Sequence, residues 1–212
     1  MEDVCLERSD KELIFKSHTN KITPKLLSSS IDKDMNKHFL TIFNRYCDKE
    51  KPVTNVKFEF TGDKKLDHEF ECVIEEAFQS LHLHGFHVDK KDGMVELWKY
   101  TSNGSKVSGP LVMHVDDRGG LEYSVETCIF YLEIDDTLEG GGLYYIENIK
   151  EHTFLGFIRY YETQTKYLEV KNCMVVLLNG NLEHRPKSIL GIGTRKCIVV
   201  QFRSLGRNID DS

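Results

Sequence analysis

The stretch Leu111-Val-Met-His-Val-Asp-Asp117 places a histidine and an aspartate two residues apart in an apolar run. We predict that this run is a β-strand. The side chains of His114 and Asp116 would then leave the same face, because successive residues of a strand alternate sides. An imidazole and a carboxylate on one face can serve as two ligands of one metal ion. His-x-Asp alone occurs by chance in many chains, where it is more often a solvated strand pair.

A third ligand and a fixed cation follow later in the chain. His184, 68 residues after Asp116, is the candidate third ligand. Two histidines and one carboxylate on one face of an octahedral ion leave three positions open, the arrangement of non-haem Fe(II) oxygenases. Arg195 lies eleven residues after His184. Its guanidinium is suited to a carboxylate of a co-substrate, because it is always charged and offers two parallel donors. Without His184, Arg195 would be interpreted as a surface charge at the start of a strand.

Composition limits the classes of protein to consider. The chain has 212 residues, 40% hydrophobic and 29% charged, which is enough for one substantial core, so we expect one domain over residues 1–212. The formal charge of −6 gives no general basic field and disfavours a nucleic-acid partner. No apolar run is long enough to span a membrane, and the first residues carry acid where a signal peptide carries base. We therefore expect an intracellular, cytoplasmic protein without a membrane partner.

The first part of the chain, residues 1–93, is predicted to hold supporting helices and strands. Apolar residues recur at helical spacing over 31–47, with Ser30 as the expected N-cap, and again over 63–81. Residues 53–60 alternate between apolar and polar, as in a strand with one wet face. We expect the two helices to pack on one face of a sheet.

From residue 94 the chain becomes a succession of short strand patterns separated by turn residues, which is typical of a sandwich or barrel. We predict loops at 102–110, 147–166 and 185–193, and expect Arg195 to open the last strand. The six cysteines show no C-x-x-C spacing, and several lie in apolar runs, so reduced structural thiols are expected.

A rival metal site is the histidine cluster of His82, His84 and His87. Their spacing could suit zinc, but no cysteine or carboxylate completes a tetrahedral set. Gly85 indicates a turn at the end of a helix, where a histidine interacts well with the helix dipole. A structural or surface role is favoured for these three residues.

The ordered set of motifs over residues 94–203 resembles the prolyl 4-hydroxylase type of Fe(II)/2-oxoglutarate oxygenase, and among these the oxygen-sensing prolyl hydroxylases. The matching elements are Tyr100, His114-Val-Asp116, Thr127-Cys-Ile-Phe-Tyr-Leu-Glu133, Glu139-Gly-Gly-Gly-Leu143, Val175-Val-Leu-Leu178, His184 and Gly193-Thr-Arg195. The resemblance implies a mainly β protein whose core, residues 94–205, is a double-stranded β-helix or jelly roll packed by the N-terminal helices.

The same resemblance implies roles for single residues. His114, Asp116 and His184 would bind Fe(II), and Arg195 would bind 2-oxoglutarate. Tyr131 matches a tyrosine that shares the distal carboxylate with the arginine, and its alternative is a core aromatic. Tyr100 matches a pocket tyrosine, although its interval to His114 is longer than the family pattern. Related enzymes often carry a small hydroxyl residue or alanine at the position of Cys197 and a threonine at that of Val199, so details of co-substrate binding differ here.

The predicted activity is hydroxylation of a C–H bond on a protein or peptide residue such as proline, with O2 as oxidant, release of succinate and CO2, and ascorbate as an accessory reductant. A second hypothesis keeps the chemistry but takes a nucleobase or free amino acid. Nucleobase enzymes of this superfamily usually carry two closely spaced arginines, whereas the next arginine after Arg195 is Arg203. A third hypothesis is a non-catalytic jelly-roll binding protein.

Overall fold

The structure is a computed structural model that describes residues 11–15, 26–47, 51, 53–59, 64–107, 112–116, 125–154, 158–179 and 182–205. Within these ranges the chain forms two helices and eleven strands, and every strand pairing is antiparallel. The prediction of a mainly β protein with supporting helices is confirmed.

The larger sheet carries most of the core. Its strands lie in the order β2 (Leu26–Ser30), β9 (Met174–Leu178), β5 (Val125–Ile134), β11 (Ile189–Ser204), β4 (Val88–Asn103) and β3 (Val53–Glu59), and β6 (Leu138–Gly140) pairs with the start of β11. The central strand is β11, which pairs Cys197 with Trp98 of β4 and with Tyr131 of β5. Arg195 therefore lies inside a long strand rather than at its start. The predicted loop at 185–193 is wrong, because these residues include β10 and the first part of β11.

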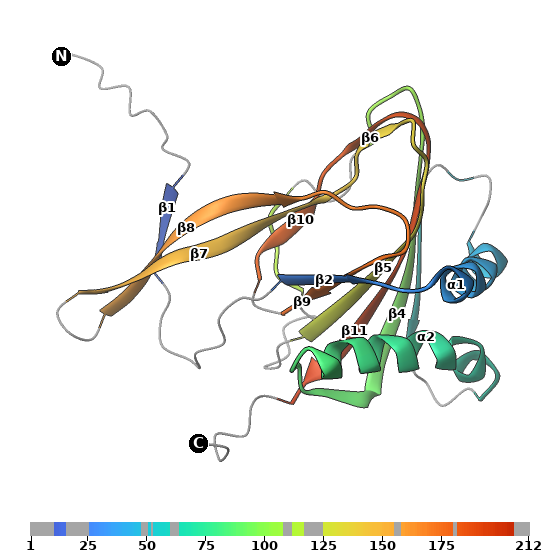
Figure 1. Ribbon diagram of the computed structural model, residues 1–212, viewed down its shortest axis with the longest axis horizontal. Coiled ribbons are helices and arrows are strands. Elements are labelled where there is room, and N and C mark those ends of the chain that lie inside the picture. The colour runs from blue at the N-terminus through green and yellow to red at the C-terminus, as the bar shows by residue number, and fades with distance from the viewer. Residues whose placement is uncertain are drawn as a thin grey trace.

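The smaller sheet has the order β1 (Lys11–Phe15), β8 (Ile158–Leu168), β7 (Leu143–Phe154) and β10 (His184–Pro186). Figure 1 shows β7 and β8 as a long twisted ribbon that extends to the left, away from the larger sheet. The predicted loop at 147–166 is therefore wrong. The segment is rich in β-branched and aromatic residues, which favour strands, but it lacks the apolar–polar alternation used to recognise the other strands.

The helices α1 (Lys33–Tyr46) and α2 (Lys64–Leu83) lie together on one face of the larger sheet (Figure 1). Asp32 is the N-cap of α1, because its Oδ1 accepts hydrogen bonds from the backbone N–H groups of Asp34 and Met35, both at 2.9 Å. The predicted cap, Ser30, is the last residue of β2 instead.

Strand alternation gives the larger sheet two distinct buried faces. On β5, Cys128, Phe130 and Leu132 join the apolar cluster formed with the helices. Ile129 and Tyr131 belong to a second cluster, which includes Leu143 of β7 and so lies between the two sheets. We call these the helix face and the inner face.

Two further predictions concern the chain as a whole. Among the described residues, no helix is both long and apolar enough to cross a bilayer. Strand β4 runs through residue 94, and β1, β2 and β3 each pair with a strand of the 94–205 region. The division of one domain into residues 1–93 and 94–205 stays a prediction.

Candidate metal centre

His114 and His184 are joined through their backbones. Each N–H donates to the other residue's carbonyl, at 3.0 Å from His114 and 2.8 Å from His184, which makes an isolated antiparallel bridge. The predicted strand over 111–117 is wrong, because within the described residues 112–116 only His114 is paired; Leu111 and Asp117 lie outside the described residues. The backbone bridge therefore brings His184 to His114, and the predicted strand does not account for the position of Asp116 beside them.

The three predicted ligands meet at one point. The Oδ1 atom of Asp116 lies 3.7 Å from Nε2 of His184 and 4.0 Å from Nε2 of His114. The two imidazole centroids are 4.7 Å apart. Both nitrogen–oxygen separations are shorter than about 4.2 Å, twice the usual metal–ligand distance. Among the described residues, these are the only three histidine, cysteine or acidic side chains whose ligand atoms lie within 4.8 Å of one another.

Each imidazole is oriented by a backbone carbonyl two residues earlier. Nδ1 of His184 lies 3.0 Å from the carbonyl oxygen of Leu182, and Nδ1 of His114 lies 3.2 Å from that of Val112. A carbonyl oxygen only accepts, so each Nδ1 must carry the proton. In a neutral imidazole with this hydrogen bond the lone pair is on Nε2, the atom that faces Asp116 and can bind a metal.

Thr127 of β5 fixes the carboxylate. Its hydroxyl donates a 2.6 Å hydrogen bond to Oδ2 of Asp116. The other oxygen, Oδ1, is the atom that faces the two imidazoles. Thr127 is almost fully buried, so this hydrogen bond is shielded from water. It defines which carboxylate oxygen is available to an ion.

Arg195 is a buried cation on the inner face. It is 4% exposed, and its Nη1 donates to the carbonyl oxygen of Gly141. Its Nε has no hydrogen-bond partner among the described residues, and no carboxylate among them forms an ion pair with it. A buried charge with unused donors is costly unless an anion completes it. The guanidinium thus has a donor that an anion could use.

Two tyrosines enclose this guanidinium. The Arg195 Cζ atom lies 4.7 Å from the ring centroid of Tyr100 and 5.9 Å from that of Tyr131. Burial raises the pKa of Tyr100 to about 12 and raises that of Tyr131 further, against the opposing effect of Arg195. Both phenols keep their protons at neutral pH and can donate to an anion. Burial also raises the pKa of the neighbouring Cys197 thiol, so that residue is neutral too.

The glycine-rich stretch 139–142 allows the main chain to approach Arg195. Gly141 has φ +74°, and a Cβ there would lie 3.2 Å from Cδ of Arg195 and 3.0 Å from Cγ2 of Ile189. A side chain at this position would be strained and would press on the arginine. Glycine thus permits the carbonyl contact that holds the guanidinium.

Strand β5 links the two halves of the site. Thr127 contacts Asp116, and Tyr131 contacts Arg195; the two lie four residues apart on the same face, about 13 Å along the strand. Thr127 and Tyr131 both lie on the inner face of β5, so the contacts with Asp116 and with Arg195 are made on the same side of the larger sheet.

The structure brings all six predicted site residues into this region, but sequence reasoning missed Thr127 and Gly141. In the sequence, both residues appear only within longer motifs that match the family, with no role of their own. A buried hydroxyl at the start of such a strand, on the same face as Tyr131, is the signal that could have identified Thr127.

The rival cluster does not assemble. His82 stacks on Phe78 of its own helix at 5.9 Å, and Nδ1 of His84 lies 2.7 Å from the carbonyl oxygen of Ser80. No group of three ligating atoms forms from His82, His84 and His87 among the described residues. These contacts fit the structural role favoured above.

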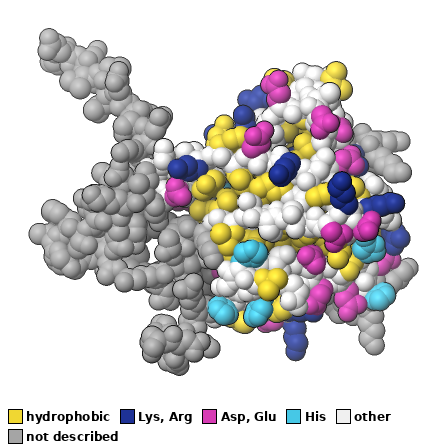
Figure 2. Space-filling view, in the orientation of Figure 1, with side chains coloured by type: hydrophobic (Ala, Val, Ile, Leu, Met, Phe, Trp, Pro, Cys, Tyr) yellow, Lys and Arg dark blue, Asp and Glu magenta, His cyan; other side chains and the backbone are white. Residues whose placement is uncertain are grey.

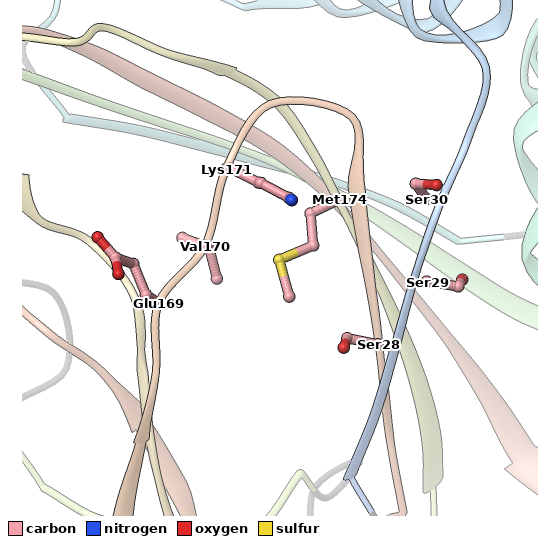
Figure 3. A pocket seen from close by; sticks show the side chains of 7 residues that line it. All are labelled: Ser28, Ser29, Ser30, Glu169, Val170, Lys171 and Met174. Carbon is pink, nitrogen blue, oxygen red and sulfur yellow. The ribbon is translucent and has the colours of Figure 1, made fainter.

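A separate hollow of about 810 Å³ opens at the edge strand β2. Figure 3 shows its lining, with Lys171 reaching toward Met174. The lining residues are Ser28, Ser29, Ser30, Glu169, Val170, Lys171 and Met174. None of them belongs to the ligand cluster or contacts Arg195, so this hollow is distinct from the candidate metal centre.

No protein-family model matches the sequence, and no curated protein matches it either. Solved structures do match. A prolyl 4-hydroxylase from Phytophthora capsici superposes with a TM-score of 0.56 at 15% identity, covering 85% of this chain and 59% of that one. HygX from Streptomyces hygroscopicus, with nickel and 2-oxoglutarate bound, gives 0.54 at 14% identity, covering 86% and 84%. The fold is that of the 2-oxoglutarate–Fe(II) oxygenases.

A third structure with this oxygenase fold is a prolyl hydroxylase from Trichoplax adhaerens in complex with a hypoxia inducible factor peptide fragment. It gives a TM-score of 0.52 at 10% identity and covers 84% of this chain and 83% of that one. The predicted double-stranded β-helix is therefore confirmed. The chain spans about three fifths of the length of the Phytophthora capsici enzyme.

Proposed function

We propose that this protein is an Fe(II)- and 2-oxoglutarate-dependent dioxygenase that hydroxylates a C–H bond of a protein or peptide residue such as proline. His114, Asp116 and His184 are its metal ligands. Arg195 binds the distal carboxylate of 2-oxoglutarate, with Tyr131 and Tyr100 beside it. The observation that carries the proposal is the pairing of a three-ligand cluster with a buried, incompletely bonded arginine in an oxygenase fold.

The donor set fits Fe(II) for chemical reasons. Two imidazole nitrogens and one carboxylate oxygen are the ligands of non-haem Fe(II) oxygenases, and three protein ligands leave positions for co-substrate and oxygen. None of the three ligands is a thiolate, so the site does not resemble a closed structural zinc site. The hydrogen bonds from Thr127 and to the two carbonyl groups set the ligand atoms before an ion arrives.

When bound, Fe(II) with 2-oxoglutarate and O2 supplies the oxidation: one oxygen atom enters the C–H bond, and the other enters succinate as CO2 leaves. The residues of the chain position the reactants. Arg195 holds the distal carboxylate by charge, and its neutral tyrosine neighbours can donate further hydrogen bonds. The apolar side chains of the inner face exclude water from this part of the site.

The surroundings of His114 favour an apolar residue in the substrate. Val112 is 75% exposed and Val115 is 39% exposed, on either side of a ligand that is itself only half-buried. We infer that these exposed valines give the entrance beside the ligand an apolar character, as the ring of a proline would require. The peptide bound to the Trichoplax adhaerens enzyme, which shares the fold, supports a peptide as the substrate class.

Succinate release tests the proposal. We expect the full chain, with Fe(II), ascorbate and 2-oxoglutarate, to form succinate slowly without substrate and faster with a proline peptide that it accepts. His114→Ala and Asp116→Ala should lower both rates to background, because each removes a ligand. Lys106→Ala, an exposed change outside the site, is the matched control and should retain the rate.

Absence of succinate together with absence of Fe(II) binding would contradict the proposal and leave a binding protein. Full activity in the His114→Ala and Asp116→Ala variants would mean that other residues hold the ion. Product analysis by mass spectrometry, with peptides and methylated oligonucleotides offered in parallel, separates a peptide substrate from a nucleobase.

A further inference from the structure

A second group of metal-ligating side chains lies between the two helices, on the opposite face of the larger sheet from the oxygenase site. Nε2 of His38, on α1, is 3.3 Å from Sγ of Cys72, on α2. A tetrahedral zinc ion with Zn–S about 2.3 Å and Zn–N about 2.0 Å holds its sulfur and nitrogen ligands about 3.5 Å apart. The observed separation is close to that of two ligands of one ion.

His68 stands one helical turn before Cys72. Residues four apart on a helix lie on the same face, so His68 and Cys72 point to the same side of α2. Nδ1 of His68 lies 3.2 Å from a carboxylate oxygen of Glu71. This contact leaves Nε2 of His68 as the free ligand atom, the carboxylate–histidine arrangement that commonly orients a metal-binding imidazole.

These side chains line a common pocket of about 560 Å³ between α1 and α2. The pocket is lined by His38, Thr41, Ile42, Arg45, His68, Glu69, Glu71, Cys72 and Glu75. Figure 2 shows histidine and acidic side chains close together at the right of the view, over these two helices. The acidic side chains favour a cation in the pocket, and the thiol and imidazoles select a borderline-soft one.

We propose that His38, Cys72 and His68 form a binding site for a zinc-class divalent cation that joins α1 to α2. In the structure His38 and Cys72 are in contact, whereas the imidazole of His68 is 82% exposed and lies away from them; a change of its side-chain rotamer brings it to the site. Binding deprotonates the Cys72 thiol, whose proton passes to solvent, and leaves one coordination position for water. The site is independent of the proposed oxygenase activity.

The nearby charges do not compete for these ligands. Glu69 is paired with Arg45 at 2.7 Å, and Glu75 is paired with Lys90 and also accepts from Gln79 at 2.8 Å. Glu71 contacts only the imidazole of His68 among the interactions of the described residues. Glu71 is therefore available to accept a hydrogen bond from Nδ1 of His68 when that imidazole turns toward Cys72.

Cobalt(II) is the probe, because a thiolate bound to Co(II) gives a charge-transfer band in the near ultraviolet that imidazole and carboxylate ligands do not. The reduced full chain, stripped of metal, should develop this band with two equivalents of Co(II), enough to fill the oxygenase site as well. A His114→Ala background should give the same band, since the oxygenase site has no thiolate. Cys173→Ser is the matched control and should also retain it.

Cys72→Ser and His38→Ala should lose the band. Glu71→Gln should weaken Co(II) binding by about tenfold, as expected for a group that orients a ligand, and His68→Ala should weaken it more. A band of full strength in Cys72→Ser, no change in His38→Ala, or no band in the unmodified chain would each overturn the proposal.

A second measurement uses only the unmodified chain and therefore tests the proposal even if the variants fail to fold. Zinc should slow alkylation of Cys72 in the unmodified chain at least about tenfold, read by peptide mass spectrometry, while Cys173 keeps its rate. Equal alkylation of Cys72 with and without zinc would also overturn the proposal.

Discussion

The two faces of the larger sheet use the same strands for different purposes. On the helix face, Phe130 of β5 and Ile198 of β11 are fully buried among apolar neighbours from α1 and α2. On the inner face of the same strands, Thr127, Tyr131 and Arg195 are equally buried but polar. Because side chains alternate along a strand, one sheet stabilises the fold on one side and holds incompletely bonded polar groups on the other. Changes to the two faces should therefore have separable effects.

The largest effect is expected on the helix face. Phe130→Ala removes a fully buried ring that packs edge-on against Phe39 at a centroid distance of 5.1 Å. The lost burial and the remaining cavity should lower the free energy of unfolding by about 3–5 kcal/mol, measured by urea denaturation. The folded fraction should bind 2-oxoglutarate unchanged. A large loss of affinity with little loss of stability would break the distinction between the faces.

The next effect is on co-substrate binding at Arg195. Arg195→Lys keeps the charge but loses the planar pair of donors and the contact between the two tyrosines. We expect 2-oxoglutarate binding, measured by calorimetry with Mn(II) present, to weaken by about 1.5–3 kcal/mol, the usual contribution of a hydrogen bond to a charged group. The affinity for Mn(II) in the absence of 2-oxoglutarate should not change. Unaltered 2-oxoglutarate affinity would show that Arg195 does not contact the carboxylate.

A smaller effect should follow from Thr127→Val, which keeps the shape of the side chain and removes the hydrogen bond to Asp116. Metal affinity should fall about tenfold to hundredfold, because the carboxylate loses the group that orients it. Thr127→Ser, which restores a hydroxyl, should recover most of the affinity. A fall in stability without a change in metal affinity would assign Thr127 to the fold alone.

The smallest expected effect is the loss of stability at high pH that ionisation of Tyr100 causes. Its pKa is raised to about 12 by burial, from 10, so its contribution to stability is complete below pH 10 and is lost as the pH rises toward 12. At pH 11 the unmodified chain should have lost about 1.4 kcal/mol from this group, and Tyr100→Phe should not show that loss. Denaturation curves at pH 8 and pH 11 compare the two proteins. Identical losses would mean that Tyr100 is not buried as described.

The elements that could be predicted are those with a clear spacing of apolar residues in the sequence. The helical spacing of Phe39, Ile42 and Phe43 predicted α1 over 31–47, close to its observed bounds of Lys33–Tyr46. The hairpin of β7 and β8 was missed, because much of it lacks the alternation that marks a half-buried strand. Strand patterns are set by burial, and burial depends on which sheets pack together.

The site was partly predictable for a different reason. The spacing of His114 and Asp116 suggested the ligands, but the strand invoked to explain their convergence is not there. The backbone bridge to His184 and the hydrogen bond from Thr127 bring the groups together, and both depend on pairings between distant segments. Residue types thus revealed the chemistry, whereas tertiary pairing determines the geometry.

The most direct test of the central claim is a crystal structure of the full chain with Mn(II) and N-oxalylglycine, an inert stand-in for 2-oxoglutarate. We expect one ion bound by Nε2 of His114, Oδ1 of Asp116 and Nε2 of His184, with the distal carboxylate of N-oxalylglycine on the Arg195 guanidinium. An ion held by other side chains, or a carboxylate bound away from Arg195, would contradict the account.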